Sequence, residues 1–471
     1  MAYTTIDDPT LYFRTKTYTG NGTNNTAYTW DETHANMRAD WLWFKNRDES
    51  QSHAAFDSIR GALLRLVPNE SGAEGTENTN LDSFDSNGFT VDNELIVNGS
   101  SDKMVAWGWS AGGSAPAITY VVKVVSDSGN KYRFDDFGTS AVTLDLQEGG
   151  TYTFDQSDSS NSGHPLRFST TSNGTHGGGS EYTTGVTTTG TPGNSGAKTV
   201  ITVAASAPTL YYYCTQHSAM GGQANTNSTF GSSNFSGSIQ STVSANTTAG
   251  FSIVSSTGNG SAGATVGHGL GKKAQLIIAK NRVTTGGYNF NVYHHKNTSE
   301  PATEIIALNE NGATSDSAIY WNDTDPTTSV FTLGSSGQSN TNGAAYIAYI
   351  FSEVKGYSKF GSYTGNGNAD GTFVNTGFRP AYVIVKLTSG SDNWNIVDNK
   401  RNLFNEAENT VRANLYNTEY TGTAYGIDLL SNGFKCRTDD GNFNGSGSDY
   451  IYWAFAESPF VNSNGVPNNA R

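Results

Sequence analysis

Cysteine, charge and long apolar runs are all scarce in this chain, and each scarcity excludes a class of protein. The two cysteines, Cys214 and Cys436, lie far apart in the sequence, so no disulfide framework is expected. Charged residues make up 15% of the chain and the net charge is -14, which opposes binding to the phosphates of nucleic acid. The apolar runs are too short to span a bilayer, so no membrane insertion is expected.

The amino terminus also lacks the features of an export signal. The stretch "MAYTTIDDPTLYF" has neither a basic start nor an apolar centre. We therefore expect a protein that is made in a cytosol and stays soluble.

Glycine and aromatic residues, in contrast, are abundant. The chain holds 54 Gly, and Phe, Trp and Tyr together make up 12% of it. Short apolar runs alternate with turns rich in Gly, Asn, Ser and Thr, a pattern typical of strands reversed by tight turns. The aromatic content is sufficient for several compact cores and argues against disorder. The sequence therefore predicts an all-β protein.

A pattern of four landmarks occurs three times. It opens with "TGNG" at residues 19–22, 257–260 and 364–367. An apolar stretch ending in lysine follows, then a mixed aromatic and polar strand, and finally a closing strand ("MVAWGWSA", "YIAYIFSE" and "YIYWAFAE"). The three lysines are Lys45, Lys280 and Lys386. Such a repeat of about 100 residues with short strands predicts three tandem jelly-roll or lectin-like β-sandwiches.

The spacing between the first and second copies is much larger than that between the second and third, which predicts an inserted domain. We expect repeat 1 and an amino-terminal docking segment over 1–116, and the insert over 117–226. A flexible linker rich in Ser, Asn and Thr should follow over 227–249. Repeats 2 and 3 should then cover 250–356 and 357–471. Residues 34–48 could form a helix, but the other repeats favour a strand there.

The insert carries four residues of the types that bind copper. "YYYCTQHSAM" places His217 and Met220 on a short loop after Cys214, and His164 stands 50 residues before the cysteine, at the start of a strand. Two imidazoles, one thiolate and a weak axial thioether are the ligand set of a blue-copper site. The residues thus predict a copper site formed by His164, Cys214, His217 and Met220.

These residues resemble those of the cupredoxins. The spacing of Cys214, His217 and Met220 is similar to the short ligand loop of the amicyanin type, and "GHPLRFS" around His164 is similar to the upstream histidine segment. The resemblance implies a cupredoxin-like Greek-key β-sandwich with copper as its cofactor. Two alternatives stay open: a site that binds no metal, with Cys214 capping a strand in the apolar interior, and a site for another metal such as zinc.

Several other polar and aromatic residues are of types found in binding sites. His294 and His295 are adjacent on a predicted strand and cannot easily converge on one metal, so we expect a pair at the surface. The three repeated lysines are expected at strand ends, where they would keep each sandwich solvated. Trp30 and Trp41 are of the type that could stack on sugar rings if exposed, although aromatic residues more often fill cores.

The "TGNG" and "SNGF" segments and the ending "YIYWAFAESPFVNSNGVPNNAR" resemble a repeated domain of structural proteins of marine tailed phages. The resemblance implies a virion component assembled in the host cytoplasm, with other virion proteins as partners and no enzymatic activity. Our leading hypothesis is a tail fibre or related appendage that binds a host-surface glycan or protein receptor. Because symmetric assembly multiplies weak contacts, we expect a homo-oligomer, with a trimer as the first guess.

Two alternative functions follow from the same residues. A capsid decoration (cement) protein would use the repeats for many weak lattice contacts. A copper-binding redox protein would use the insert for electron transfer.

Overall fold

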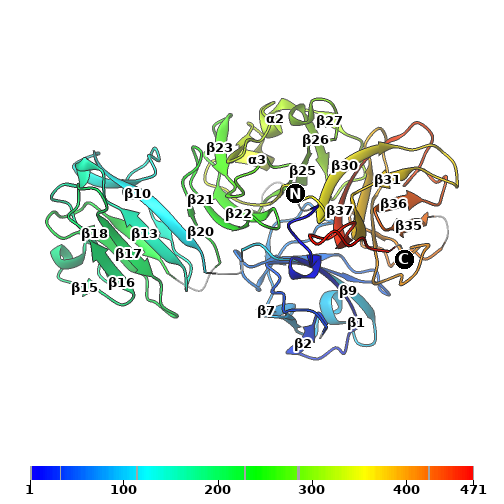
Figure 1. Ribbon diagram of the computed structural model, residues 1–471, viewed down its shortest axis with the longest axis horizontal. Coiled ribbons are helices and arrows are strands. Elements are labelled where there is room, and N and C mark those ends of the chain that lie inside the picture. Colours follow the sequence, from blue (N-terminus) through cyan, green and yellow to red (C-terminus); the bar gives the residue numbers. More distant parts are fainter. Residues whose placement is uncertain are drawn as a thin grey trace.

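The computed structural model describes residues 3–31, 33–112, 115–226, 230–283, 287–422 and 425–469. The protein is all-β, as predicted, and the α-helices of these residues, α1 (Leu95–Asn98), α2 (Ala318–Trp321) and α3 (Gly337–Asn340), have four residues each. A large body contains the three repeats, and the inserted unit lies to one side of it (Figure 1).

Each repeat builds an inner sheet with the same order of its four central strands. Repeat 1 has β1 (Phe13–Thr19), β9 (Lys103–Trp109), β3 (Trp41–Asn46) and β4 (Ala54–Asp57). Repeat 2 has β22 (Phe251–Thr257), β29 (Ala345–Phe351), β24 (Leu276–Asn281) and β25 (Phe290–His294), and continues into β26 (Glu304–Ala307) and β27 (Ser315–Asp316). Repeat 3 has β30 (Ser358–Thr364), β37 (Asp449–Pro459), β32 (Phe378–Leu387) and β33 (Trp394–Asp398), followed by β34 (Val411–Arg412).

The strand register also recurs. The repeated lysine lies opposite Val105 in repeat 1, Ile347 in repeat 2 and Ile451 in repeat 3. The first residue of each "TGNG" pairs with the start of the closing strand in all three copies. In repeat 1 the strand begins at Trp41, and residues 34–40 are not helical. The three copies therefore share one strand topology.

A smaller outer sheet covers one face of each inner sheet and completes a β-sandwich. The outer strands are β2 (Thr26–Thr29), β8 (Gly88–Val91) and β7 (Leu81–Asp85) in repeat 1, β23 (Ala264–Gly267) and β28 (Val330–Leu333) in repeat 2, and β31 (Phe373–Asn375), β36 (Gly433–Cys436) and β35 (Ile427–Leu430) in repeat 3. Each pair of sheets encloses a separate apolar core. Two short strands, β5 (Leu64–Arg65) and β6 (Gly75–Thr76), form a further hairpin in repeat 1.

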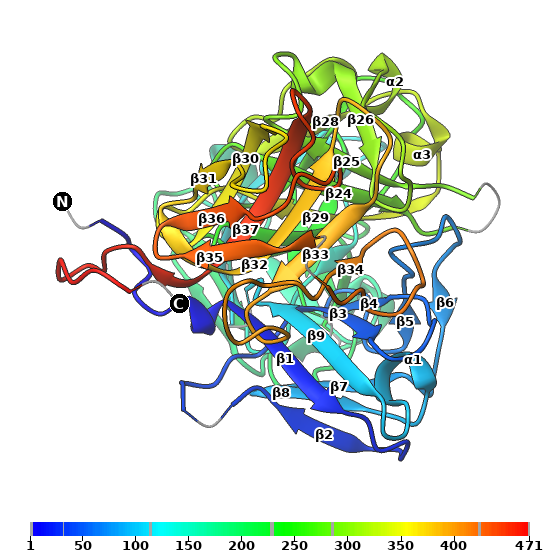
Figure 2. The same ribbon diagram turned by 90° about the vertical axis from the view of Figure 1, so that its right-hand side faces the viewer.

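The other faces of the three inner sheets meet in one apolar core that belongs to all three repeats. Trp41 of repeat 1 stacks on Tyr349 of repeat 2, with ring centroids 4.3 Å apart. Phe13 of repeat 1 stacks on Phe455 of repeat 3 at 5.2 Å. The inner strands are thus buried on both faces, which explains their almost continuous apolar sequence. Figure 2 shows these strands, among them β3, β9, β24, β29, β32 and β37, around one centre.

The expectation that the repeated lysines keep the sandwiches solvated is wrong. Lys45, Lys280 and Lys386 are buried, and each ammonium donates hydrogen bonds to backbone carbonyls. One acceptor in each case belongs to another repeat: the carbonyls of Tyr416, Ser71 and Asn311 respectively. The lysines lie at strand ends as expected, but the neighbouring repeat covers them. They therefore form a cyclic set of contacts, from repeat 1 to 3, from 2 to 1 and from 3 to 2.

Trp30 and Trp41 are also buried, so neither is available to stack on a sugar ring. Trp30 lies between the sheets of repeat 1, and its indole N–H donates to the Met37 carbonyl at 2.9 Å. Trp41 lies in the core that the three repeats share. The need to fill these cores with large apolar side chains explains both positions.

The inserted unit is a sandwich of two five-stranded sheets with its own core. One sheet has the order β11 (Asn130–Phe134), β10 (Ala117–Ser126), β13 (Thr151–Asp155), β17 (Lys198–Thr202) and β16 (Val186–Thr189). The other has the order β12 (Leu144–Asp145), β19 (Gly222–Asn225), β18 (Leu210–Cys214), β14 (Leu166–Ser169) and β15 (Glu181–Tyr182). Aromatic side chains fill the space between the sheets, as in the edge-to-face pair Phe154 and Phe168.

The expected flexible linker over 227–249 forms ordered strands where the structure describes it. β20 (Ser232–Asn234) and β21 (Ser241–Asn246) make a hairpin that extends the inner sheet of repeat 2. Phe235, between these strands, packs in the core of the inserted unit against Tyr120 and Phe134. The polar composition suggested a spacer, but one face of the hairpin is buried against the insert. The segment therefore connects the insert to repeat 2.

Candidate metal centre

Two paired strands bring the predicted ligand residues together. β14 and β18 are antiparallel, and Leu166 lies opposite Cys214. His164 stands two residues before the start of β14, and Cys214 is the last residue of β18, so both lie at the same edge of the sheet. The loop after β18 then carries His217 back over this edge. A strand order fixed by the core of the insert thus positions residues that are 50 positions apart in sequence.

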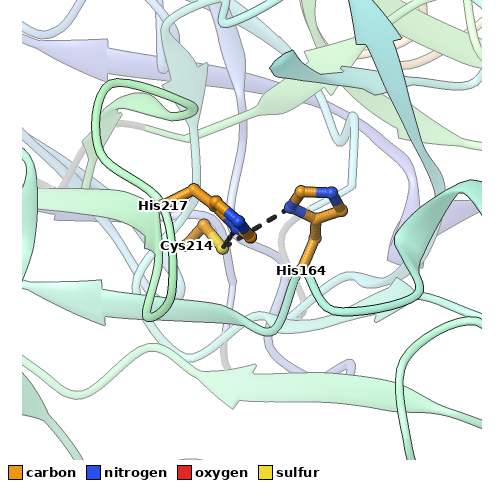
Figure 3. Close-up of side chains that lie close together, drawn as sticks. All are labelled: His164, Cys214 and His217. Atoms are coloured by element: carbon orange, nitrogen blue, oxygen red, sulfur yellow. Dashed lines mark hydrogen bonds between the residues drawn. The ribbon is translucent and has the colours of Figure 1, made fainter.

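The cysteine sulfur faces both imidazoles. Cys214 Sγ lies 3.9 Å from His164 Nδ1 and 3.8 Å from His217 Nδ1. One ligand atom from each of the three residues falls within 4.8 Å of the others (Figure 3). Cys214 is buried, His164 is half-buried and His217 is exposed. The group therefore lies at the rim of the insert, with its sulfur on the inner side.

These distances fit a single metal ion between the three atoms. Bonds of about 2.3 Å to sulfur and about 2.0 Å to nitrogen, separated by 120°, put the sulfur and nitrogen about 3.7 Å apart, whereas a tetrahedral angle gives about 3.5 Å. The observed 3.8 and 3.9 Å are closer to the trigonal value. Two imidazoles and a thiolate in a plane are the arrangement of a copper centre of the blue-copper type.

Met220, the fourth predicted ligand, is buried in the same apolar cluster as Cys214. Its backbone carbonyl accepts a hydrogen bond of 3.0 Å from the amide of Tyr132, which anchors the end of the ligand loop. The structure thus places Met220 inside the insert and close to the end of the loop that begins at Cys214.

Hydrogen bonds from neighbouring residues hold the ligand segments in place. The His164 carbonyl accepts from Tyr132 Oη at 2.9 Å and from Gln156 Nε2 at 2.8 Å. The carbonyl of Cys214 lies 3.1 Å from His176 Nε2. These contacts fix the backbone at both ligand segments. Sequence reasoning missed Tyr132 and Gln156, because Tyr132 lies on β11 and Gln156 directly follows β13, and only the folded sheet brings them to His164.

The loop with His217 is anchored in the same way. Asn173 Oδ1 accepts from the Ala219 amide at 2.7 Å, and the Lys131 ammonium donates to the Ala219 carbonyl. Ala219 has a φ of 59°, in the left-handed region, and these bonds support that turn. His217 is thereby kept over Cys214.

Burial and the nearby His217 ring lower the pKa of His164 below its ordinary value. The neutral imidazole is therefore favoured at neutral pH, which is the form that binds a metal.

The other histidine pair lies in a different environment from the one expected. His294 is buried rather than exposed, with its Nε2 atom 3.1 Å from the Tyr452 carbonyl of repeat 3. His295 Nε2 lies 2.6 Å from the Phe360 carbonyl. The inner sheet of repeat 3 covers both rings, and the two side chains point to different acceptors. The prediction of a surface pair is wrong, because the packing between repeats buries His294 and leaves His295 only partly exposed.

The chain matches the family model described as a domain of unknown function, DUF7483, over residues 8–132 and 222–459. The matched segments make up more than half of the chain. The chain belongs to this family. The DUF7483 match includes the strands of all three repeats and omits 133–221, the segment that holds His164, Cys214, His217 and Met220.

Neither a curated protein nor a solved structure matches the chain. In the ranges that the structure describes, no helix has the length and apolar character to cross a membrane.

Proposed function

We propose that this DUF7483 protein is a non-enzymatic structural component of a bacteriophage particle, and that its inserted unit is a cupredoxin-like domain that binds one copper ion. The observation that carries the copper proposal is that Cys214 Sγ lies 3.9 Å from His164 Nδ1 and 3.8 Å from His217 Nδ1. His164, Cys214 and His217 would hold the ion, and Met220 would be the fourth, weak ligand.

Copper in such a site exchanges one electron between Cu(I) and Cu(II). The chain contributes a buried thiolate on the inner side, a half-buried imidazole and an exposed imidazole at the surface. The exposed edge of His217 is the part that an external partner could reach.

A spectroscopic titration tests the copper proposal. Addition of Cu(II) to the purified chain should produce the intense visible band of a thiolate–copper bond at one equivalent, and Cys214→Ser should abolish it. Cys436→Ser is the matched control, since Cys436 is the other buried free cysteine and lies in repeat 3. If the protein stays colourless and binds zinc but no copper, the site is a zinc site. If Cys214→Ser leaves metal binding unchanged, the proposed site is refuted.

The proposal of a virion role is supported by the repeats themselves. One chain wraps three copies of a sandwich around a shared core and needs no disulfide, since both cysteines are free. Such a body suits a tail fibre or appendage that attaches to host-surface glycans, and equally a decoration protein that caps the capsid lattice. Because three modules already surround one shared core, the chain needs no homotrimer to make a threefold arrangement. Light scattering of the purified chain measures its mass and so tests whether it forms the trimer first guessed.

Copy number separates the candidate roles. Quantitative mass spectrometry of purified particles should find a few to tens of copies for a fibre and hundreds for a decoration protein. A chain absent from particles but able to exchange electrons through the insert would instead be a copper redox protein.

A further inference from the structure

Two of the three interfaces between repeats contain an arginine–glutamate–arginine group in which one arginine is buried and the other two side chains are partly exposed. Between repeats 1 and 2, Glu74 accepts from Arg60 Nη1 at 2.9 Å and from Arg282 Nη2 at 2.8 Å. The Glu74 amide also donates to the Arg282 carbonyl at 3.2 Å. Burial acts to raise the pKa of Glu74, but the two guanidinium groups hold it below its ordinary value. The carboxylate is thus a charged bridge between two repeats.

The interface between repeats 3 and 1 repeats this arrangement. Glu419 accepts from Arg401 Nη1 at 3.0 Å and from Arg47 Nη2 at 2.7 Å. Its amide donates to the Arg47 carbonyl at 2.9 Å. Arg47 and Arg282 each stand two residues after the repeated lysine, and the glutamate comes from the neighbouring repeat in both cases.

The third interface, between repeats 2 and 3, keeps the backbone contact and lacks all three charges. The Thr314 amide donates to the Thr388 carbonyl at 3.0 Å, the bond that corresponds to those of the two glutamates. Thr388 stands two residues after Lys386, where the other repeats have arginine. Asn297 takes the place of the second arginine, and Thr314 Oγ1 donates to Asn297 Oδ1 at 2.7 Å.

Because these three side chains are short, the interface opens into a pocket of 580 Å³. This volume is within the range of about 300–1,000 Å³ found for small-molecule sites. Asn297, Thr298 and Thr314 line it from repeat 2, and Ser362, Thr388 and Ser389 line it from repeat 3. The pocket is polar on both sides, unlike most sites for apolar ligands.

The hydrogen bonds already made leave both donors and acceptors for a ligand. Ser389 Oγ accepts from the Asp449 amide at 3.0 Å and Thr298 Oγ1 accepts from the Glu300 amide at 3.1 Å, so each hydroxyl still has its proton to donate. Thr314 Oγ1 donates to Asn297, so its lone pairs can accept. A hydroxyl group that donates and accepts at once is the complementary ligand group.

The charges at the pocket are balanced, and two tyrosines line it. Lys296 and Asp449 contribute one charge of each sign to the lining. Tyr363 and Tyr450 also line the pocket; their rings stack on each other with centroids 4.9 Å apart, and only Tyr363 is partly exposed. A partly exposed tyrosine beside many hydroxyl groups suits the C–H and O–H groups of a pyranose.

We propose that the pocket between repeats 2 and 3 binds a neutral sugar, at the place where the other two interfaces are closed by arginine and glutamate. The inference rests on the proposed function in so far as it names the site through which the body contacts host-surface glycans.

The test uses saturation-transfer NMR of the intact chain with the methyl glycosides of glucose, galactose, mannose and N-acetylglucosamine. At least one should receive magnetisation from the wild-type protein. The triple variant Asn297→Arg, Thr314→Glu and Thr388→Arg copies the charged group of the other interfaces into the pocket, and should weaken binding at least tenfold. Ser362→Arg, a single change at an exposed position of β30, should have the same effect if the triple variant does not fold.

Three outcomes would overturn the proposal: no transfer to any of the four glycosides, transfer that both variants leave unchanged, or transfer only to sialylated or sulfated sugars added to the same panel. Unchanged binding in the variants would leave glycan attachment in place at another site. Loss of binding in the variants, together with absence of the chain from purified particles, would keep the sugar site and reject the virion role.

Discussion

The body and the inserted unit place their polar groups in opposite ways. In the body, charged side chains pair between repeats, where buried Arg60 and partly buried Glu74 and Arg282 hold two modules together. In the insert, the titratable cluster of His164, Cys214 and His217 lies at a rim and reaches the surface. The DUF7483 match includes the strands of the three repeats and omits 133–221. The difference teaches that charge in the body serves assembly of the repeats, whereas the insert is a separate unit with chemistry of its own.

The largest expected effects separate the stability of the two regions. Asp398→Ala should destabilise the body by about 3–5 kcal/mol, because Arg401 would be left buried without its nearest carboxylate. Asp398 also accepts from the indole N–H of Trp107 in repeat 1 at 3.1 Å, so two repeats lose a contact. Phe154→Ala, in the core of the insert, should cost about 3–5 kcal/mol there. In calorimetry, Asp398→Ala should lower the midpoint temperature of the body's unfolding, and Phe154→Ala that of the insert.

The shared core predicts a second result of the same calorimetry experiment. The three repeats should unfold together, since removing one exposes the apolar face of the others. Three separate transitions for the body would contradict the shared core. If Phe154→Ala lowers the midpoint temperature of the body's unfolding as much as that of the insert, the two regions do not unfold independently.

The next effect, of about 2 kcal/mol, concerns pH and the buried lysines. Burial lowers the pKa of Lys280 to about 8, from an ordinary value of 10.5. Above pH 8 the folded state loses this proton before the unfolded state does, so the unfolded state binds more protons and the free energy of unfolding rises with pH. The gain should be about 2 kcal/mol between about pH 8 and 9.5, at about 1.4 kcal/mol per pH unit.

Chemical denaturation of the wild type and of Lys280→Met over this range isolates the lysine, because every other group titrates in both proteins. The difference in unfolding free energy, wild type minus variant, should increase with pH. A difference that stays constant would mean that the folded protein keeps Lys280 charged throughout this range.

The repeats were predictable from the sequence because each copy satisfies its own strand pairing. Lys45, Lys280 and Lys386 mark the same register position in three sheets, and the order of landmarks survives in the fold. The burial of these lysines was not predictable, since the carbonyls that accept their hydrogen bonds across the interfaces belong to a different repeat. Comparison of the copies with one another describes a single module and contains no information on how modules pack.

The candidate metal centre shows the same division. Residue types and spacing were enough to select His164, Cys214 and His217 as one set of ligands, and the structure brings these three together. Tyr132 and Gln156, which hold the His164 carbonyl, became visible only once the strands of the insert were paired. The ordered hairpin β20–β21 escaped prediction for a related reason: its composition is that of a linker, and its order comes from burial against the insert.

The smallest effect tests how the insert tunes its proposed ion. Met220→Leu keeps nearly the same volume in the buried cluster, so the insert should lose less than about 1.5 kcal/mol of stability. His164, Cys214 and His217 remain, so the visible band of the proposed thiolate–copper bond should persist. Loss of the weak axial sulfur favours Cu(I), and the reduction potential should therefore rise. Voltammetry of the two proteins measures the shift, and an unchanged potential would show that Met220 acts as a core residue, like the apolar side chains around it.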